Sequence, residues 1–305
     1  MIQLRQVSKL FAPQWAVRGL DLEIARGEIF GLLGHNGAGK STAIGMMLGQ
    51  VWPTAGDILV GGHDVTLHRR RALEKVGAIF ESPAFYDFLS GWRNLEIFSH
   101  YSARTTPARM REVIDWVGLA GREHGRVKTY SHGMRARLAL AQALLPKPEL
   151  LILDEPSDGL DPEGIHEMRQ TIRRLHRELG LTILLSSHLL SEVEQLCTRI
   201  AVMKQGRKVF EGSLAQARLA QDGVRLRTAD FAAAADLLTR AGLITGTLDG
   251  GVIRPGPGIG TDEIVRRLVA AGMPVFEIAP VEQTLEGFYL ALMNGSASGN
   301  VNPSP

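Results

Sequence analysis

The stretch Gly34-His35-Asn36-Gly37-Ala38-Gly39-Lys40-Ser41-Thr42 decides how this chain folds and what it binds. It matches the pattern of a glycine, four residues and Gly-Lys-Ser/Thr, in which backbone N–H groups surround the phosphates of a nucleotide. Residues 28–33 before it form a short apolar run typical of a buried strand, and residues 42–48 begin a helix. Lys40 is expected to reach the β- and γ-phosphates, and Ser41 to bind Mg²⁺. A chance match of a glycine-rich turn is the alternative, and the order of strand, loop and helix argues against it.

Composition places the chain among globular proteins of one large domain or two. It has 305 residues, of which 45% are hydrophobic and 22% charged, and a net charge of +2 gives no strong attraction for nucleic acid or a membrane surface. No apolar run approaches the ~18–20 residues that span a bilayer, and the N-terminus lacks a signal-peptide layout. The single cysteine, Cys197, excludes an internal disulfide and predicts a reducing, cytosolic compartment. We expect Cys197 to be a small buried apolar residue on a helix.

Two aromatic residues near the N-terminus are candidates for stacking on an adenine ring. They lie between residues 2–7 and 20–24, which alternate apolar and polar side chains as half-buried antiparallel strands do. A flat aromatic face accommodates a base, and of Phe11 and Trp15 we choose Phe11 from its place at the end of the run Ser8-Lys9-Leu10-Phe11. Packing of both rings in the core or in a hairpin is the alternative.

The middle of the chain carries a second candidate for phosphate contact. Residues 76–80 read as a strand that ends at Glu81, and aromatic and aliphatic residues recur at helical spacing over 92–119. The run Tyr130-Ser131-His132-Gly133-Met134 then precedes a helix expected over 135–145. Ser131 is well placed as its N-cap.

Carboxylates follow a strand that reads as central. Residues 150–153 are a continuous apolar run, typical of a parallel strand covered on both faces, and Asp154-Glu155 come directly after it. Asp161 precedes a helix over about 163–179, and His188 stands at the end of the strand 182–187. Because α/β sheets bind ligands at the carboxyl ends of their strands, we expect these side chains to face the nucleotide.

The pattern changes after Gly212. Residues 213–294 read as strand-helix-strand-strand-helix-strand and a last helix, which suggests a small α+β sandwich of the ferredoxin-like kind. Residues 295–305 are rich in Gly, Ser, Asn and Pro and are expected to be disordered.

Residues 1–212 together resemble the ATP-binding-cassette (ABC) ATPases. The motifs occur in the right order, and jointly they are highly specific: the aromatic at Phe11, the phosphate loop, Glu81, the signature 130–134, Asp154-Glu155, the Asp161 loop and His188. The resemblance implies an α/β P-loop cassette with a RecA-like core, an antiparallel β subdomain and a helical subdomain over about 88–146. The small α+β domain at 213–294 would follow it.

The resemblance also implies roles for single residues. Two copies would sandwich two ATP molecules, so that each nucleotide meets the phosphate loop of one copy and Ser131 and Gly133 of the other. Asp154 would hold Mg²⁺ through water, Glu155 would be the general base, His188 would contact the γ-phosphate, and Asp161 would cross the interface. A structural carboxylate at Glu155 and a hydrogen-bonding strand-end histidine at His188 are the alternatives. The nucleotide-binding set would then be Phe11, Gly34, His35, Asn36, Gly37, Ala38, Gly39, Lys40, Ser41, Thr42, Ser131, Gly133 and Asp161.

Two departures from the broad family point to one branch of it. Glu81 stands where glutamine is usual, and Tyr130, His132 and Met134 stand where Leu, Gly and Gln are common. A glutamate is a hard oxygen ligand, so Glu81 is expected to bind Mg²⁺ beside Ser41 and Asp154, the alternative being a loop cap. Such departures are similar to those of the bacitracin-resistance and lantibiotic-immunity ATPases, which power export permeases of the ABC-2 kind.

We therefore expect an ATP hydrolase, with ATP and Mg²⁺ as its ligands, that drives export of a drug or antibiotic peptide. It would act as a homodimer on a separate membrane permease, at the inner face of a bacterial plasma membrane, without a nucleic-acid partner. An importer ATPase with a regulatory C-terminal domain is the first alternative, and a cassette outside transport the second. We favour dimer contact or bracing as the task of residues 213–294.

Overall fold

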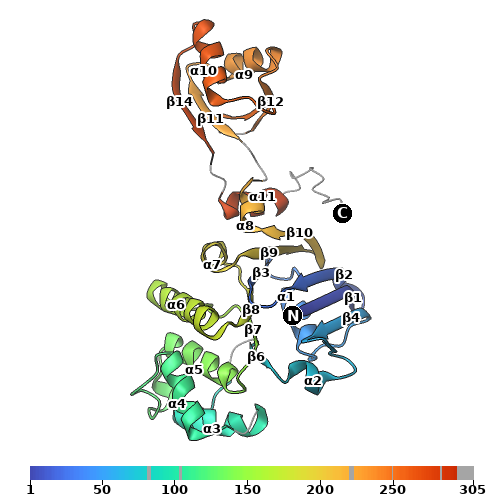
Figure 1. Cartoon of the computed structure of the whole chain (residues 1–305), viewed down its shortest axis with the longest axis vertical. Coiled ribbons are helices and arrows are strands. Elements are labelled where there is room, and N and C mark those ends of the chain that lie inside the picture. The colour runs from blue at the N-terminus through green and yellow to red at the C-terminus, as the bar shows by residue number, and fades with distance from the viewer. Residues whose placement is uncertain (81–83, 103–104, 220–222, 249, 282–283, 294–305) are drawn as a thin grey trace. The chain divides into compact units, whose positions relative to one another are not determined.

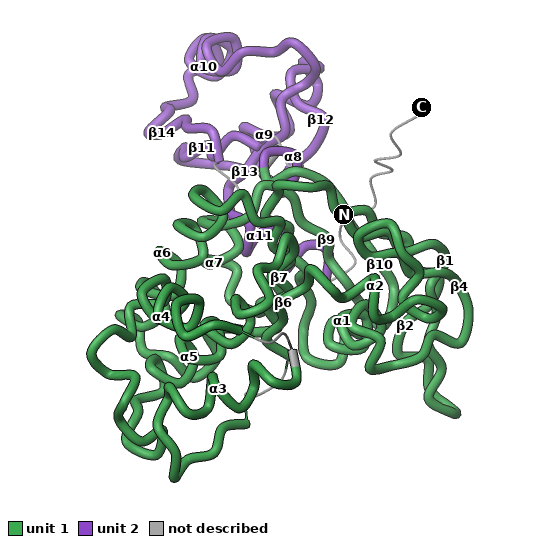
Figure 2. The backbone as a smooth tube through the Cα atoms, turned by 60° about the horizontal axis from the view of Figure 1, so that its bottom comes forward, with its two compact units in different colours: residues 1–214 green, residues 215–305 purple. Residues whose placement is uncertain are grey.

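The chain folds into two compact units, residues 1–214 and residues 215–305 (Figure 2). The computed structural model describes residues 1–80, 84–102, 105–219, 223–248, 250–281 and 284–293. Within these described ranges, none of the helices combines the length and apolar character that crossing a membrane requires.

A six-stranded sheet forms the centre of the first unit (Figure 1). Its order is β10-β9-β3-β8-β7-β6, and all neighbours are parallel except β9 and β10. Every residue of β3, β7 and β8 is buried, as predicted for parallel strands covered on both faces. The carboxyl ends of these strands therefore meet at one edge. The bounds are β3 Ile29–Leu33, β6 Val76–Ile79, β7 Leu150–Asp154, β8 Thr182–Ser186, β9 Arg199–Lys204 and β10 Arg207–Ser213.

A second, antiparallel sheet has the order β2-β1-β4-β5. Its strands are β1 Ile2–Phe11, β2 Gln14–Ile24, β4 Ala55–Val60 and β5 His63–Asp64. The alternation expected for residues 20–24 is present, whereas in 2–7 it is interrupted, since Arg5 and Gln6 are both exposed where the pairing register shifts. Both strands are longer than predicted, because pairing continues to Phe11 opposite Gln14. Apolar side chains of this sheet share one core with the central sheet and the first helix. Residues 11–16 are thereby held on a strand pair rather than in a free loop.

Helices cover the central sheet and build the segment 88–146. They are α1 Lys40–Met47, α2 Arg69–Leu73, α3 Gly91–Ser102, α4 Pro107–Trp116, the 3₁₀ turn η1 Val127–Thr129, α5 His132–Leu144, α6 Pro162–Leu179 and α7 Leu190–Leu196. Helix α5 begins three residues before the predicted start at 135. The reason is its cap: Ser131 Oγ accepts a hydrogen bond from the Met134 N–H at 3.2 Å.

The second unit contains a four-stranded antiparallel sheet with the order β12-β13-β11-β14. With two helices between the strands, this is the split βαβ arrangement of ferredoxin-like folds that the sequence suggested. Side chains of α9 and α10 form one core with the strands. The bounds are α8 Leu214–Leu219, β11 Val224–Thr228, α9 Phe231–Arg240, β12 Ile244–Leu248, β13 Val252–Pro255, α10 Thr261–Ala270, β14 Val275–Pro280 and α11 Leu285–Met293.

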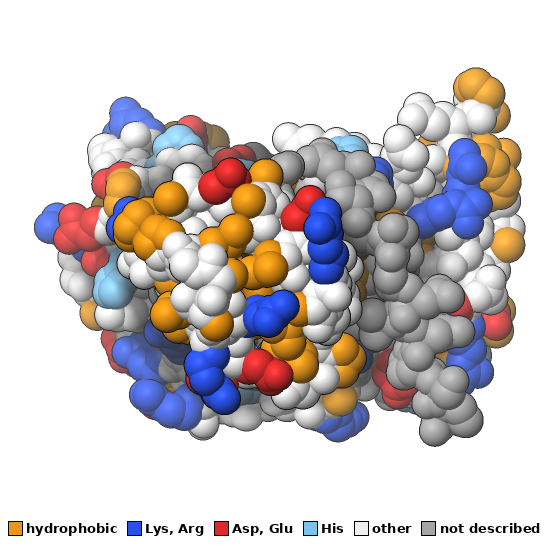
Figure 3. All heavy atoms as spheres, turned by 90° about the horizontal axis from the view of Figure 1, so that it is seen from above, with side chains coloured by type: hydrophobic (Ala, Val, Ile, Leu, Met, Phe, Trp, Pro, Cys, Tyr) orange, Lys and Arg blue, Asp and Glu red, His pale blue; other side chains and the backbone are white. Residues whose placement is uncertain are grey.

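The surface at the α10 end is mixed in character. Seen from that side, hydrophobic side chains gather among Lys and Arg side chains (Figure 3). Val269 of α10 and Phe276 of β14 are each 59% exposed. This unit therefore presents apolar as well as basic groups to solvent.

Candidate nucleotide-binding and catalytic site

The phosphate loop leaves the buried strand β3 and enters α1 in a fixed conformation. Gly39, the N-cap of α1, has φ 104°, and an added Cβ would lie 2.4 Å from the Ala16 carbonyl oxygen. Only glycine is compatible with this position. Lys40 is 5% exposed, and its Nζ donates to the Gly34 carbonyl oxygen at 2.7 Å. The Lys40 side chain thus bonds the first residue of the phosphate loop that the sequence motif predicts.

A pocket of about 500 Å³ opens over this loop. Its wall includes the aromatic residues Phe11 and Trp15, which are 51% and 37% exposed. Both candidate rings therefore border the pocket, and the choice of Phe11 over Trp15 stays a prediction. The lining residues are Phe11, Gln14, Trp15, Ala16, His35, Asn36, Gly37, Gly39, Lys40, Ser41, Thr42 and Glu155.

Three predicted site residues from distant parts of the sequence meet beside this pocket, and two of them, Lys40 and Glu155, line it. Lys40 Nζ lies 3.4 Å from Glu155 Oε1, an ion pair without hydrogen-bond geometry. The other carboxylate oxygen, Oε2, accepts from the His188 backbone N–H at 3.1 Å and lies 2.7 Å from His188 Nδ1. Glu155 has φ 48°, a left-handed conformation that is uncommon for a residue with a side chain and often found at functional sites.

The residues predicted to hold Mg²⁺ have the chemistry for it. Asp154, at the end of β7, is 7% exposed, and its Oδ1 has no hydrogen-bond partner among the described residues. Ser41 supplies a hydroxyl at the start of α1, on the pocket wall. The part of the chain that the structure describes contains no group of three or more metal-binding side chains. Mg²⁺ commonly takes one or two protein oxygens and completes its shell with phosphates and water, so Ser41 and Asp154 fit it.

Residues predicted to act across a dimer do not line the pocket of their own chain. Ser131 and Gly133 lie at the start of α5, outside the lining set. Asp161 caps α6, because its Oδ1 accepts from the Gly164 N–H at 2.8 Å. The cap gives Asp161 a structural task that the sequence analysis did not assign. Glu81, the predicted third metal ligand, lies outside the described residues, as does the tail 295–305.

The unusual residues of the signature make specific contacts. Tyr130 is 8% exposed, and its hydroxyl donates to the Arg122 carbonyl oxygen at 2.7 Å. Burial raises the pKa of this phenol. His132 is exposed but borders the turn before α6, since a Cβ on Gly159 would lie 3.4 Å from its Cδ2. The Tyr130 hydrogen bond therefore anchors the residue before Ser131 to the segment around Arg122.

Sequence reasoning missed part of the pocket wall. Gln14 and Ala16 of β2 line it, although they belong to the antiparallel sheet and carry no motif. It also missed a buried pair next to His188, formed by Ser187 and Glu192. The five-residue separation and the turn between strand and helix hide that pair from a periodicity search.

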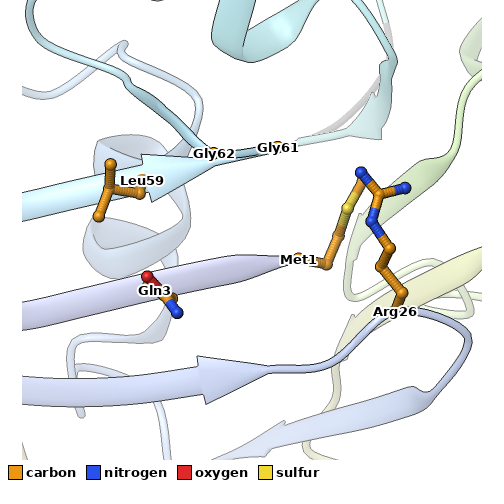
Figure 4. A pocket seen from close by; sticks show the side chains of 6 residues that line it. All are labelled: Met1, Gln3, Arg26, Leu59, Gly61 and Gly62. Carbon is orange, nitrogen blue, oxygen red and sulfur yellow. The ribbon is translucent and has the colours of Figure 1, made fainter.

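A different hollow, of about 280 Å³, lies at the edge of the antiparallel sheet (Figure 4). Its lining contains none of the predicted site residues, and the Met1 and Arg26 side chains approach each other at one side of it. The lining residues are Met1, Gln3, Arg26, Leu59, Gly61 and Gly62.

Comparison with known proteins assigns the family. The family pattern described as "ABC transporter" matches residues 17–158, and one described as "AAA domain, putative AbiEii toxin, Type IV TA system" matches residues 126–194. The bacitracin transport ATP-binding protein BcrA of Enterococcus faecalis is 35% identical over 97% of each chain. The linearmycin resistance ATP-binding protein LnrL of Bacillus subtilis (strain 168) is 37% identical over 70% of this chain and 69% of its own.

A solved structure shares the fold of the first unit. The dimeric structure of MJ0796, a bacterial ABC transporter cassette, matches with a TM-score of 0.63 and 23% identity, covering 70% of this chain and 99% of that one. The predicted cassette fold is thus confirmed. Together with the phosphate loop and the Lys40–Glu155–His188 cluster, these likenesses establish that the chain belongs to the ABC transporter family, as an ATP-binding subunit that hydrolyses ATP.

Proposed function

We propose that this subunit powers export of a drug or antibiotic peptide through a separate membrane permease. The observation that carries this proposal is the 35% identity to a bacitracin transport ATP-binding protein over 97% of both chains, so that the likeness includes the second unit. Likeness to a linearmycin resistance protein supports the same direction. ABC cassettes work with permease subunits, so the proposed place of action is the inner face of a bacterial plasma membrane.

The proposed hydrolysis uses Glu155 as general base. A carboxylate within reach of a bound nucleotide can take the proton of an attacking water as the water oxygen bonds to the γ-phosphorus. The bond from that phosphorus to the β–γ bridging oxygen breaks in the same reaction, so that ADP and phosphate are the products. In the structure the Glu155 carboxylate is held between Lys40 at 3.4 Å and the two hydrogen-bonding groups of His188 at 2.7 and 3.1 Å. Because His188 uses Nδ1 toward Glu155, its Nε2 lies on the far side of the ring and is the atom proposed to contact the γ-phosphate.

Ser41 and Asp154 are the proposed Mg²⁺ ligands, Asp154 through water, and Glu81 is the proposed third. When bound, the ion would neutralise charge on the phosphate oxygens. The unpartnered Oδ1 of Asp154 supports this assignment, since a buried carboxylate oxygen without a hydrogen bond is costly.

The proposed active form is a head-to-tail pair of chains. ABC cassettes dimerise, and we assign Ser131 and Gly133 of one copy to the phosphates held by the other. An N-terminal helix end adds N–H groups and partial positive charge to an anion site. Both residues lie at the start of α5 and away from their own pocket, which supports a role toward a second copy. Residues 213–294 are proposed to contact the second copy or to brace that dimer.

The test joins the chain to the permease encoded by a neighbouring gene in a bacitracin-sensitive bacterium. We expect the pair to raise the inhibitory concentration of a peptide antibiotic at least fourfold, and the pair carrying Glu155→Gln not to raise it. Unchanged sensitivity to a panel of peptide and lipid-active antibiotics would contradict export. Uptake that needs a separate extracellular binding protein would instead establish the importer alternative.

A further inference from the structure

A buried polar pair involves the residue that directly precedes His188. Ser187 is 1% exposed and Glu192 is 2% exposed, and the Ser187 hydroxyl donates to Glu192 Oε2 at 2.9 Å. The same hydroxyl oxygen accepts from the Leu189 N–H at 3.0 Å. The Ser187 side chain thus bonds both the backbone just after His188 and a side chain of the helix that follows.

The turn that carries His188 has little else to define its shape. Strand β8 ends at Ser186 and helix α7 begins at Leu190, so only residues 187–189 connect them. Leu189 stands at the N-cap position of α7 and supplies no side-chain cap. Ser187 instead closes a local turn, because its hydroxyl accepts from the N–H two residues further along the chain. Its partner, Glu192, is fixed on α7.

Two separate carboxylates hold this turn. Glu155 Oε2 accepts from His188 N and bonds its Nδ1, at 3.1 and 2.7 Å. Glu192 Oε2 accepts from the hydroxyl of the preceding residue, Ser187, at 2.9 Å. A shift of the His188 backbone would therefore strain hydrogen bonds to both carboxylates.

The chemistry of the pair argues for more than stability. Burying a carboxylate is expensive, and apolar residues of similar volume often stabilise a protein equally or better. A buried ionisable side chain whose hydrogen bond lies next to a reacting group is better explained by the geometry that it imposes.

We propose that Ser187 and Glu192 are positioning residues that fix His188 relative to Glu155 in ATP hydrolysis. This inference rests on the proposed roles of Glu155 and His188. Neither Ser187 nor Glu192 touches the nucleotide. They set the angle from which the imidazole meets the Glu155 carboxylate and, on its other side, the γ-phosphate.

The test measures basal ATPase activity and urea unfolding of the full-length chain carrying Ser187→Ala, with Ser187→Thr as the conservative variant. We expect Ser187→Ala to lower kcat about 5- to 30-fold, with KM for ATP within twofold of the parent. Such a fall corresponds to a rise of roughly 1–2 kcal/mol in the activation free energy, because His188 is no longer held in its orientation. Ser187→Thr keeps the hydroxyl and should stay within threefold of the parent. Ser191→Ala, at an exposed serine of α7, is the matched control and should change nothing.

A double variant separates positioning from stability. Ser187→Ala leaves Glu192 buried without its bond, so unfolding should become easier. Adding Glu192→Leu removes the orphaned carboxylate, and replacing both partners by apolar groups can be nearly neutral for stability. We expect the double variant to regain most of the lost stability but not the lost kcat. Recovery of kcat together with stability would overturn the proposal, as would parental kcat in Ser187→Ala.

These outcomes are distinct from failure of the proposed function. The measurements need neither permease nor cargo, so a wrong assignment of export leaves them valid. If Glu155 is not the base, the Glu155→Gln chain keeps its activity. A lower kcat in Ser187→Ala would then report on the position of His188 alone.

Discussion

Replacing Glu155 by glutamine tests the centre of the proposed chemistry. The amide keeps the size of the side chain and one oxygen that can accept from the His188 N–H groups now bonded at 2.7 and 3.1 Å. Lys40 keeps its 2.7 Å bond to the Gly34 carbonyl, so the phosphate loop should retain its shape. What disappears is the basic oxygen that accepts the proton of the attacking water.

The expected loss is in kcat and not in binding. General-base catalysis contributes about 10²–10⁴-fold, which corresponds to roughly 2.7–5.5 kcal/mol in the activation free energy at about 1.36 kcal/mol per tenfold. Nucleotide affinity should stay the same or rise, because Lys40 loses a competing negative charge 3.4 Å from its Nζ.

Two measurements on the purified chain check this prediction: phosphate release at saturating ATP, and equilibrium binding of a fluorescent ATP analogue. Glu163→Gln, an exposed glutamate in the first turn of α6, is the matched control and should behave as the parent. A Glu155→Gln chain that retains more than a tenth of the parental kcat, or that loses affinity while keeping kcat, would refute the assignment of Glu155 as base.

Three further predictions concern Ser131, Gly39 and Cys197. Ser131→Ala should lower the free energy of unfolding by about 0.5–2 kcal/mol through loss of the cap, whereas Ser131→Asn should keep the cap. Introduced into the Glu155→Gln chain, both substitutions should abolish ATP-dependent dimerisation, measured by light scattering. Gly39→Ala should prevent tight ATP binding and cost more in urea unfolding than Gly37→Ala, because both positions have positive φ but only at Gly39 does a Cβ meet the Ala16 carbonyl, at 2.4 Å. Burial, reinforced by Glu192, raises the pKa of the Cys197 thiol, so the folded chain should resist iodoacetamide at pH 9. Above about pH 8.5 the unfolded chain loses this proton while the folded chain keeps it, so stability should fall as pH rises; equal labelling of folded and unfolded chain would contradict this.

The sequence determined the elements that local patterns encode. A glycine-rich loop between an apolar run and a helix specifies strand, phosphate loop and helix, because backbone freedom at Gly39 and burial of residues 29–33 are short-range requirements. A continuous apolar run specified β7 as a central parallel strand, and a serine before a helical segment specified the cap of α5. The order of the second unit followed from the same periodicities.

Tertiary structure alone decided which distant residues meet. Lys40, Glu155 and His188 lie together because β3, β7 and β8 are parallel neighbours whose carboxyl ends converge, and no periodicity records that adjacency. The same is true of Gln14 on the pocket wall, since it lies on a strand of another sheet. The cap made by Asp161 depends on the observed start of α6 and its hydrogen bond to Gly164. Sequence patterns report the surroundings of one segment at a time, whereas these contacts join segments that only packing brings within hydrogen-bond distance.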